Sequence, residues 1–125
     1  MPIILILLLN FELLAKSEFT SVFIKNCYDG DTCTAIDGEK IRLACIDTPE
    51  LKGENSEPEK AIKARDFLNT LVAQRKISIR RIAKDRYGRT VAELYKGRIN
   101  IQELIVKKGF GKIYKKYAFQ CDWTK

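Results

Sequence analysis

The feature that most restricts the fold of this chain is a pair of Asp-Gly steps between short runs of β-branched and apolar residues. The runs cover residues 20–27, 32–36 and 40–46, and the steps between them are Asp29-Gly30 and Asp37-Gly38. Asp-Gly between two such runs is a strong signal for a tight hairpin turn. The sequence therefore predicts a β-meander, in which the middle strand pairs with both of its neighbours.

Two helix patterns and two more strand patterns follow this meander. From Glu57 to about Gln74 apolar residues recur every three or four positions, and Ser56 stands three residues before Glu59 as in a capping box. A shorter helix is predicted from Asn100 to Lys108, because asparagine is a favoured N-cap residue and Gly109 can end a helix. The further strands are predicted at residues 76–83 and 90–95.

The order of these elements is three strands, a helix, two strands and a helix. It predicts an α+β fold, mainly β, in which five strands close into a barrel of the oligonucleotide-binding type with two helices. A chain of 125 residues suits a single domain, and its 46% of hydrophobic residues can build a core.

The formal net charge of +7 favours an anionic partner: nucleic acid, acidic lipid or an acidic protein. The same charge is also compatible with ordinary surface solubility. The chain contains no histidine. This excludes the serine and cysteine triads that use histidine, as well as histidine-dependent nucleases.

Residues 1–17 differ in composition from the rest of the chain. Ile3 to Leu9 is an uninterrupted apolar run, and charged residues end the apolar stretch before the ~20 residues that a membrane-spanning helix needs. The run resembles the apolar core of a secretory signal, with Ala15-Lys16-Ser17 as a small-residue cleavage site, although no basic residue precedes it. We expect a signal peptide or a membrane anchor at 1–17, with a first strand or helix of the fold as the remaining alternative, and one domain at 18–125. The expected location is secreted or periplasmic, or alternatively membrane-anchored.

The four cysteines are Cys27, Cys33, Cys45 and Cys121. Their spacing contains no C-x-x-C pair, which argues against a zinc ribbon. An even number permits two disulfides without requiring them. Cys27 and Cys33 flank the first predicted turn and can lie near each other, whereas Cys45 sits in an apolar run and is predicted to be a small buried hydrophobic residue.

Two aspartates stand where the meander brings strand ends together. Asp31 begins the second strand and Asp47 follows the third, so antiparallel pairing places them at one end of the barrel. Two facing carboxylates raise each other's pKa unless a cation lies between them. Oxygen ligands without histidine favour a hard ion such as Ca²⁺ or Mg²⁺. The alternative is that both are ordinary turn residues.

Arginines and a further acid add a chemical argument. Arg42 and Arg89 could neutralise the charge that develops on a phosphate, and Glu50 is an available base for a water molecule in a chain without histidine. One difficulty is that Arg42 lies five residues before Asp47. Alternation along a regular strand would place these two side chains on opposite faces unless a bulge intervenes.

Four separated motifs resemble those of staphylococcal nuclease-like domains, also called thermonucleases. They are YDGDT, IRLACIDTPE, DRYGRTVAELY and INIQELIVKKGFGKIY, and the resemblance covers about residues 22–117. It implies an oligonucleotide-binding barrel that cleaves DNA and RNA with Ca²⁺ and leaves 3′-phosphate products. The strong twist of that barrel would resolve the difficulty over the faces of the third strand.

The resemblance also implies a role for each matching residue. The Ca²⁺ ligands would be the carboxylates of Asp31 and Asp47 and the backbone carbonyl of Thr48. The pair that binds phosphate and stabilises the transition state would be Arg42 and Arg89. Glu50 resembles the residue that orients or deprotonates the attacking water. The residues near the nucleotide would be Arg86 and Tyr87.

Two departures from the family pattern are visible. A second nucleotide-contacting tyrosine of the family falls at Lys115, with Tyr114 and Tyr117 on either side. The third helix of the family is expected to be missing. As alternatives to a nuclease we consider a non-catalytic module that binds nucleic acid or protein, and a membrane-tethered interaction domain. We expect a monomer that acts on DNA and/or RNA and touches a membrane transiently, if at all, through residues 1–17.

Overall fold

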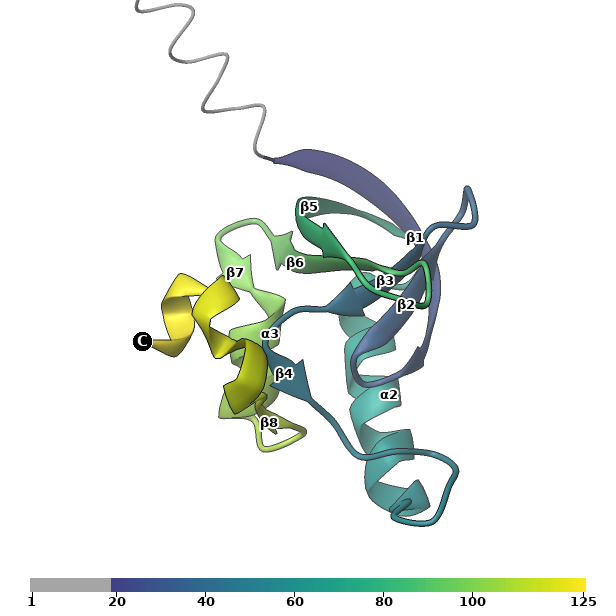
Figure 1. Cartoon of the computed structure of the whole chain (residues 1–125). Coiled ribbons are helices and arrows are strands. Elements are labelled where there is room, and N and C mark those ends of the chain that lie inside the picture. Colours follow the sequence, from purple (N-terminus) through teal and green to yellow (C-terminus); the bar gives the residue numbers. More distant parts are fainter. Residues whose placement is uncertain (1–18) are drawn as a thin grey trace, which may run out of the picture.

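The computed structural model describes residues 19–125, in which five strands close into a barrel (Figure 1). The barrel strands are β1 (Thr20–Asp29), β2 (Thr32–Ala35), β3 (Lys40–Leu43), β5 (Arg75–Lys84) and β6 (Thr90–Lys96). β2 pairs antiparallel with β1 and β3, and β5 pairs antiparallel with β1 and β6. Parallel pairing of β3 with β6 closes the sheet. The predicted meander and the five-stranded barrel are confirmed.

The long helix α2 (Pro58–Val72) covers one end of the barrel with a stripe of small and apolar residues, namely Ala61, Ala64, Leu68 and Val72. The predicted capping box is wrong, because Glu57 is the N-cap residue and no side chain caps this end. The chain enters the helix through a backbone bond from Glu57 N–H to the carbonyl of Glu50 (3.0 Å). Pro58 in the first turn presets the helical φ and lacks one of the N–H groups that a cap would satisfy.

The short helix α3 (Ile101–Lys107) begins as predicted. The side chain of Asn100 accepts a hydrogen bond from the backbone N–H of Glu103 at 3.1 Å. Ile101 and Ile105 are fully buried against the barrel. Gly109, with φ of 80°, follows the helix and lets the chain reverse toward β8 (Lys112–Ile113).

The predicted third strand at 40–46 is interrupted. β3 ends at Leu43, a turn at Ala44 and Cys45 follows, and β4 (Ile46–Asp47) pairs with β8 in a separate two-stranded sheet. Cys45 adopts a φ of 69°, which redirects the chain. The alternation that would have set Arg42 and Asp47 on opposite faces is therefore broken by this turn, and barrel twist is not needed to explain it.

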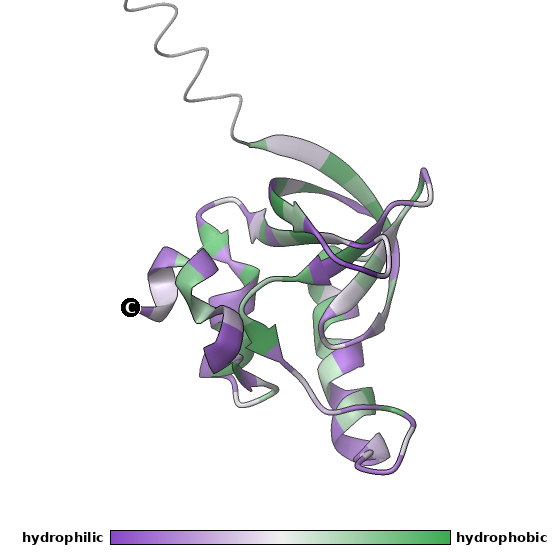
Figure 2. Cartoon of the chain, viewed as in Figure 1, coloured by the Kyte–Doolittle hydropathy of each residue, from purple (hydrophilic) through white to green (hydrophobic). Residues whose placement is uncertain are grey.

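The core fills the barrel interior and the space beneath the two helices. In Figure 2 hydrophobic and hydrophilic residues alternate along α2 and along the barrel strands. The largest fully buried apolar side chains come from four barrel strands, from β4 and from both helices: Ile24, Ile41, Leu43, Ile46, Leu68, Val72, Ile77, Ile79, Leu94, Ile101 and Ile105.

After β8 the chain forms two short 3₁₀ helices, η1 (Lys115–Gln120) and η2 (Asp122–Thr124), which lie beside α3 and β4 in yellow in Figure 1. Short strand β7 (Ile99–Asn100) pairs with β6. Among residues 19–125 the α-helices are α2 and α3. No helix in this part of the chain is long and apolar enough to cross a membrane. The signal peptide or anchor predicted at 1–17 lies outside the described residues.

All four cysteines form disulfides. Cys27 of β1 pairs with Cys33 of β2. Cys45, in the turn after β3, pairs with Cys121, which lies between η1 and η2. The prediction for Cys45 was correct in its burial, since the residue is 3% exposed, and wrong in its chemistry. Cys45 and Cys121 are 76 residues apart in the sequence, so their pairing could not be predicted from local sequence patterns.

Candidate active site

The β1–β2 turn carries Asp31 into the interior of the protein. Asp31 is 4% exposed, and its carboxylate accepts hydrogen bonds from the backbone N–H of Thr48 and from the hydroxyl of Thr32, each at 3.1 Å. Gly30 allows this close packing, because a Cβ there would lie 2.7 Å from Cβ of Ala64 and 2.9 Å from Oγ1 of Thr48. The turn therefore packs directly against α2 and against the segment after β4.

β3 presents Arg42 to the same carboxylate. Nη2 of Arg42 lies 3.3 Å from Oδ2 of Asp31, and Nη1 donates a hydrogen bond to the carbonyl of Leu43 at 2.6 Å. The Arg42 side chain is only 16% exposed, so solvent screens this ion pair weakly. The pairing register sets Arg42 opposite Thr32, which explains why an arginine of β3 reaches the β1–β2 turn.

The carboxyl group of Glu50 interacts electrostatically with four other predicted site residues. Partial burial of its carboxyl and the negative charges of Asp31 and Asp47 raise the pKa of Glu50, whereas Arg42 and Arg89 oppose this shift. Two acids and two arginines from different elements thus act on one exposed carboxylate. A carboxylate with a raised pKa is a stronger base than one in water.

Asp29 is an acid that our sequence reasoning missed. It is 7% exposed, and its Oδ1 accepts a hydrogen bond from the backbone N–H of Asp31 at 3.0 Å. Burial and the neighbouring carboxylate of Asp31 raise the pKa of Asp29 from 3.8 to about 7, with a smaller contribution from Glu50. The spacing Asp-Gly-Asp was a usable signal, but we had interpreted Asp29 only as a turn residue.

A second missed residue, Asp85, holds Arg89 in place. Oδ2 of Asp85 lies 2.6 Å from Nε of Arg89, and Oδ1 accepts from the backbone N–H groups of Tyr87 and Arg89, each at 2.9 Å. Burial acts to raise the pKa of Asp85, but these hydrogen bonds lower it overall. An acid four residues before an arginine in a polar turn was the available sequence signal.

The β5–β6 turn also forms the rim of a pocket of about 570 Å³. Tyr87 is 67% exposed there, with the guanidinium of Arg86 5.0 Å and that of Arg89 5.3 Å from its ring centre. The pocket is also lined by the chain between Arg42 and Ile46 and by Tyr114, Lys116, Tyr117 and Gln120. The pocket combines positive charge with exposed aromatic rings, a combination suited to single-stranded nucleic acid.

The structure thus arranges the predicted residues in two neighbouring groups. Direct contacts join Asp31 to Arg42 and Thr48, and Arg42 and Arg89 line the basic pocket together with the predicted nucleotide-binding residues Arg86 and Tyr87. A second hollow of about 460 Å³ is lined by Asp47, Thr48 and Glu50.

We call the group formed by Asp31, Asp47 and Thr48 the acidic end, and its donor atoms fit a hard cation. Within residues 19–125 the hydroxyl oxygen of Thr48 is buried without a hydrogen-bond partner, and all cysteine sulfurs are in disulfides. The chain has no histidine, so oxygen is the available ligand type. No group of three or more acidic or cysteine side chains in this part of the chain forms a cage of its own. A cation here would need backbone carbonyls, water or substrate oxygens, which Ca²⁺ accepts readily.

Fold and charge arrangement together define an oligonucleotide-binding-type barrel with an acidic end beside a basic, aromatic pocket. The chain belongs to the staphylococcal nuclease family: the family model described as "Staphylococcal nuclease homologue" matches residues 40–124. The resemblance that the four motifs indicated is therefore confirmed.

Individual relatives agree with this family. The chain is 35% identical over 118 residues to a protein named "Uncharacterized endonuclease" from Haemophilus influenzae, an alignment covering 90% of this chain and 64% of the relative. It is 30% identical over 106 residues to "Endonuclease YncB" from Bacillus subtilis, covering 78% of this chain and 50% of the relative. It is 31% identical over 86 residues to "Staphylococcal-like nuclease CAN1" from Arabidopsis thaliana, covering 69% and 25% respectively. The chain therefore spans only part of the length of each.

Proposed function

We propose that this protein is a calcium-dependent nuclease that hydrolyses phosphodiester bonds in DNA and/or RNA. The observation that carries the proposal is that buried Asp31 contacts both Arg42, which lines the basic pocket with Arg89, and Thr48, which lines the second hollow with Glu50. Phosphoryl transfer needs such a base beside groups that stabilise negative charge. Family membership and the endonuclease names of the relatives support the same reaction class.

In the proposed reaction Glu50 orients a water molecule and takes its proton as the water oxygen attacks phosphorus in line. Arg42 and Arg89 stabilise the charge on the phosphoryl oxygens, and the forked guanidinium suits this because it donates two parallel hydrogen bonds. The bond from phosphorus to the 5′ oxygen breaks, and that oxygen gains a proton. The products are a 3′-phosphate and a 5′-hydroxyl.

The residues that would hold the cation are Asp31 and Asp47, through their carboxylates, and Thr48, through its backbone carbonyl. A bound Ca²⁺ would supply charge neutralisation at the phosphate and a lower pKa for water. The chain's own contribution is to keep Asp31 buried and oriented by the Thr48 N–H and the Arg42 guanidinium. Arg86 and Tyr87 would hold the nucleotide next to the reacting phosphate.

The test is cleavage of a single-stranded DNA oligonucleotide in Ca²⁺, in Mg²⁺ and in chelator, alongside calcium titration by calorimetry. We expect activity with Ca²⁺, weak or no activity with Mg²⁺ at equal concentration, and none in Asp47→Ala. Asp66→Ala, which removes an exposed aspartate of α2, is the matched control and should retain activity. Full activity in chelator, or unchanged calcium binding in Asp47→Ala, would contradict the calcium site and mean that the aspartates are ordinary turn residues.

We also propose that the protein works outside the reducing cytoplasm, in a secreted or periplasmic form. The apolar run at Ile3–Leu9 and the two disulfides support this, since disulfides persist in oxidising compartments. Membrane anchoring through residues 1–17 is the alternative. Fractionation of cells expressing the whole chain, with N-terminal sequencing of the product, distinguishes cleavage after Ser17 or nearby from retention of the leader.

A further inference from the structure

One wall of the basic pocket comes from the last part of the chain. We call residues 114–125 the C-terminal strap; it contains η1 and η2 and lies beside β4 and α3 in Figure 1. Tyr114, Lys116, Tyr117 and Gln120 of the strap line the pocket. The strap carries three lysines and one aspartate, and the rings of Tyr114 and Tyr117 lie 5.3 Å apart.

The strap has little burial of its own. Neither η1 nor η2 contains a buried residue, whereas Cys121 between them is fully buried. Short 3₁₀ segments have poor hydrogen-bond geometry and seldom persist without tertiary support. The position of the strap therefore depends on the points at which it is fastened to the barrel.

The covalent fastening is the disulfide between Cys121 and Cys45, and Cys45 itself lines the pocket. Trp123 of the strap also packs against the core. It joins the strap to the turn that separates β3, which carries Arg42, from β4, which carries Asp47. Next to it, the backbone N–H of Tyr114 donates to the carbonyl of Cys45 at 2.8 Å. The strap thus meets the turn at Cys45 through both a disulfide and a backbone hydrogen bond.

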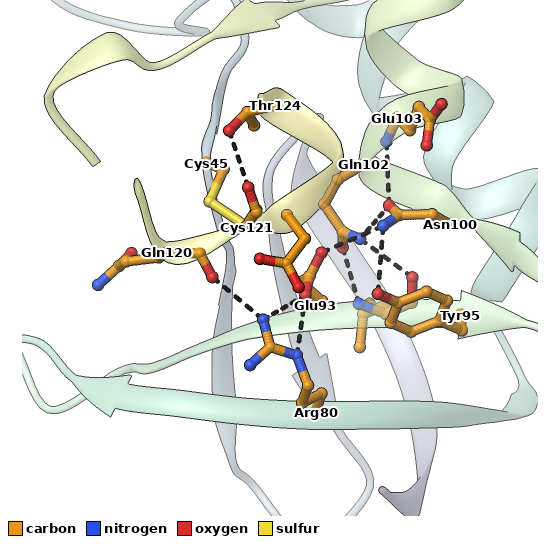
Figure 3. Close-up of polar contacts among 12 residues, drawn as sticks. Cys45, Arg80, Glu93, Tyr95, Asn100, Gln102, Glu103, Gln120, Cys121 and Thr124 are labelled. Carbon is orange, nitrogen blue, oxygen red and sulfur yellow. Dashed lines mark hydrogen bonds and ion pairs between the residues drawn. A yellow bond between two sulfur atoms is a disulfide. The ribbon is translucent and has the colours of Figure 1, made fainter. Parts of the chain in front are cut away.

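Side-chain hydrogen bonds attach the strap to β5 and also close it on itself (Figure 3). Arg80 of β5 is paired with the buried carboxylate of Glu93 and also donates a hydrogen bond to the carbonyl of Gln120 at 3.1 Å. Thr124 donates its hydroxyl to the carbonyls of Ala118 (2.7 Å) and Cys121 (2.8 Å), which closes the strap on itself.

We propose that the Cys45–Cys121 disulfide is a positioning device for substrate binding: it holds the strap as the preformed second wall of the nucleic-acid pocket. This inference rests on the proposed nuclease function. The groups assigned to the chemical step belong to the barrel and its loops. The strap would supply lysine and tyrosine side chains that contact the bound nucleic acid. Breaking the disulfide should therefore weaken binding of the nucleic acid and leave the chemical step nearly unchanged.

The first test compares the two disulfides in the whole chain. In Cys45→Ala/Cys121→Ala we expect KM for a single-stranded DNA oligonucleotide to rise about tenfold, equivalent to loss of about 1.4 kcal/mol of binding, with kcat within about twofold. In Cys27→Ala/Cys33→Ala, which removes a disulfide away from the strap, KM should stay within about twofold. Circular dichroism verifies that each variant is folded at the assay temperature.

The second test keeps the disulfide and applies if the first variant fails to fold. Thr124→Val removes the hydroxyl that closes the strap and should raise KM by about threefold, which is about 0.6 kcal/mol. Thr70→Val is the matched control, because Thr70 likewise donates its hydroxyl to a carbonyl, that of Phe67 at 2.6 Å, on α2 away from the pocket. Its KM should not change.

A binding measurement separates this inference from the proposed function. Fluorescence anisotropy of a labelled single-stranded oligonucleotide in chelator gives Kd without cleavage. If the wild-type protein binds the oligonucleotide but never cleaves it, the nuclease proposal fails and the Kd values still test the strap. If the folded Cys45→Ala/Cys121→Ala protein, or Thr124→Val in its place, keeps wild-type KM and Kd, the positioning role of the disulfide is overturned.

Discussion

The two disulfides hold two unlike regions of the candidate site. Cys27–Cys33 joins residues six positions apart in the β1–β2 hairpin, whose turn carries Asp29 and Asp31. Cys45–Cys121 joins residues 76 positions apart and fastens the strap that walls the basic pocket. The first disulfide thus closes a hairpin that is local in sequence, whereas the second joins distant segments beside the basic pocket.

Burial follows the same division. Asp31 is 4% exposed and held by three neighbouring groups, whereas Tyr87 on the pocket rim is 67% exposed. A rigid acidic end suits groups that must be held in exact relation to a reacting phosphate, and an open basic pocket suits a flexible strand. The two regions meet at Arg42, which contacts Asp31 and also lines the basic pocket.

The largest expected effect on this comparison is on stability. A disulfide that closes a longer loop restricts the unfolded chain more, so removing Cys45–Cys121 should cost about 4.5 kcal/mol and removing Cys27–Cys33 only about 2 kcal/mol. Denaturant unfolding of the two double-alanine variants measures both values. Equal losses, or a larger loss for the hairpin disulfide, would contradict the division into local and long-range support.

The next effect concerns the acidic end alone. Glu50→Gln should lower kcat by about 10²-fold or more, because the amide cannot accept the proton of the attacking water. Binding of Ca²⁺ and of the oligonucleotide should change little, since Glu50 is not a proposed ligand. Glu54→Gln, an exposed glutamate of the same loop, is the control. Wild-type cleavage by Glu50→Gln would mean that water is activated without this base.

A smaller effect is expected from the residue that orients Arg89. Asp85→Asn weakens the contact with the guanidinium while keeping an acceptor for the backbone N–H groups of the turn, so kcat/KM should fall about tenfold, or about 1.4 kcal/mol. Asp37→Asn changes a comparable turn aspartate, which accepts from Glu39 N–H at 3.0 Å, and should have no effect. If both variants behave alike, Asp85 supports only its turn.

The smallest effect is a pH dependence of the metal-free protein. Because the folded pKa of Asp29 is raised to about 7, the folded state binds more protons than the unfolded state between about pH 4 and pH 7. In chelator, the contribution of Asp29 to stability should therefore fall as pH rises through this range, by roughly 4 kcal/mol for the full shift. The lowered pKa values of Glu39 and Asp85 act in the opposite direction, so we expect a net fall on the order of 1 kcal/mol. Thermal melts at pH 5 and pH 7 measure the change, and Asp29→Asn should flatten it. A stability that rises with pH in wild type and variant alike would contradict the assignment.

Much of the fold follows from local signals. The two Asp-Gly steps mark the positions of the hairpins, and Gly38, with φ of 93°, adopts a conformation that few other residues reach at low energetic cost. Asn100 caps α3 as predicted. The resemblance of the short motifs also led to the residues around Glu50. These features depend on neighbours in sequence, so the sequence alone was enough to predict them.

Other features depend on contacts between distant segments. The positive φ in the turn after β3 belongs to Cys45 and not to a glycine, so no local sequence signal predicted it. The disulfide partner of Cys45, Cys121, lies 76 residues away. The capping box at Ser56 failed because a backbone bond from Glu57 to Glu50 already fixes the entry to α2. Local propensities of a few tenths to about 1 kcal/mol give way when tertiary contacts supply more.

By itself, therefore, the sequence determined the meander, the helix positions and the set of charged residues that a phosphodiester would meet. The tertiary structure decided which of these charged residues lie close enough to interact electrostatically. Burial in a turn that Gly30 lets pack against α2 is the largest cause of the raised pKa of Asp29, and Arg42 lies near Asp31 because β3 pairs with β2. The physical reason is that desolvation and electrostatic interaction depend on distance in space, which the order of residues along the chain does not contain.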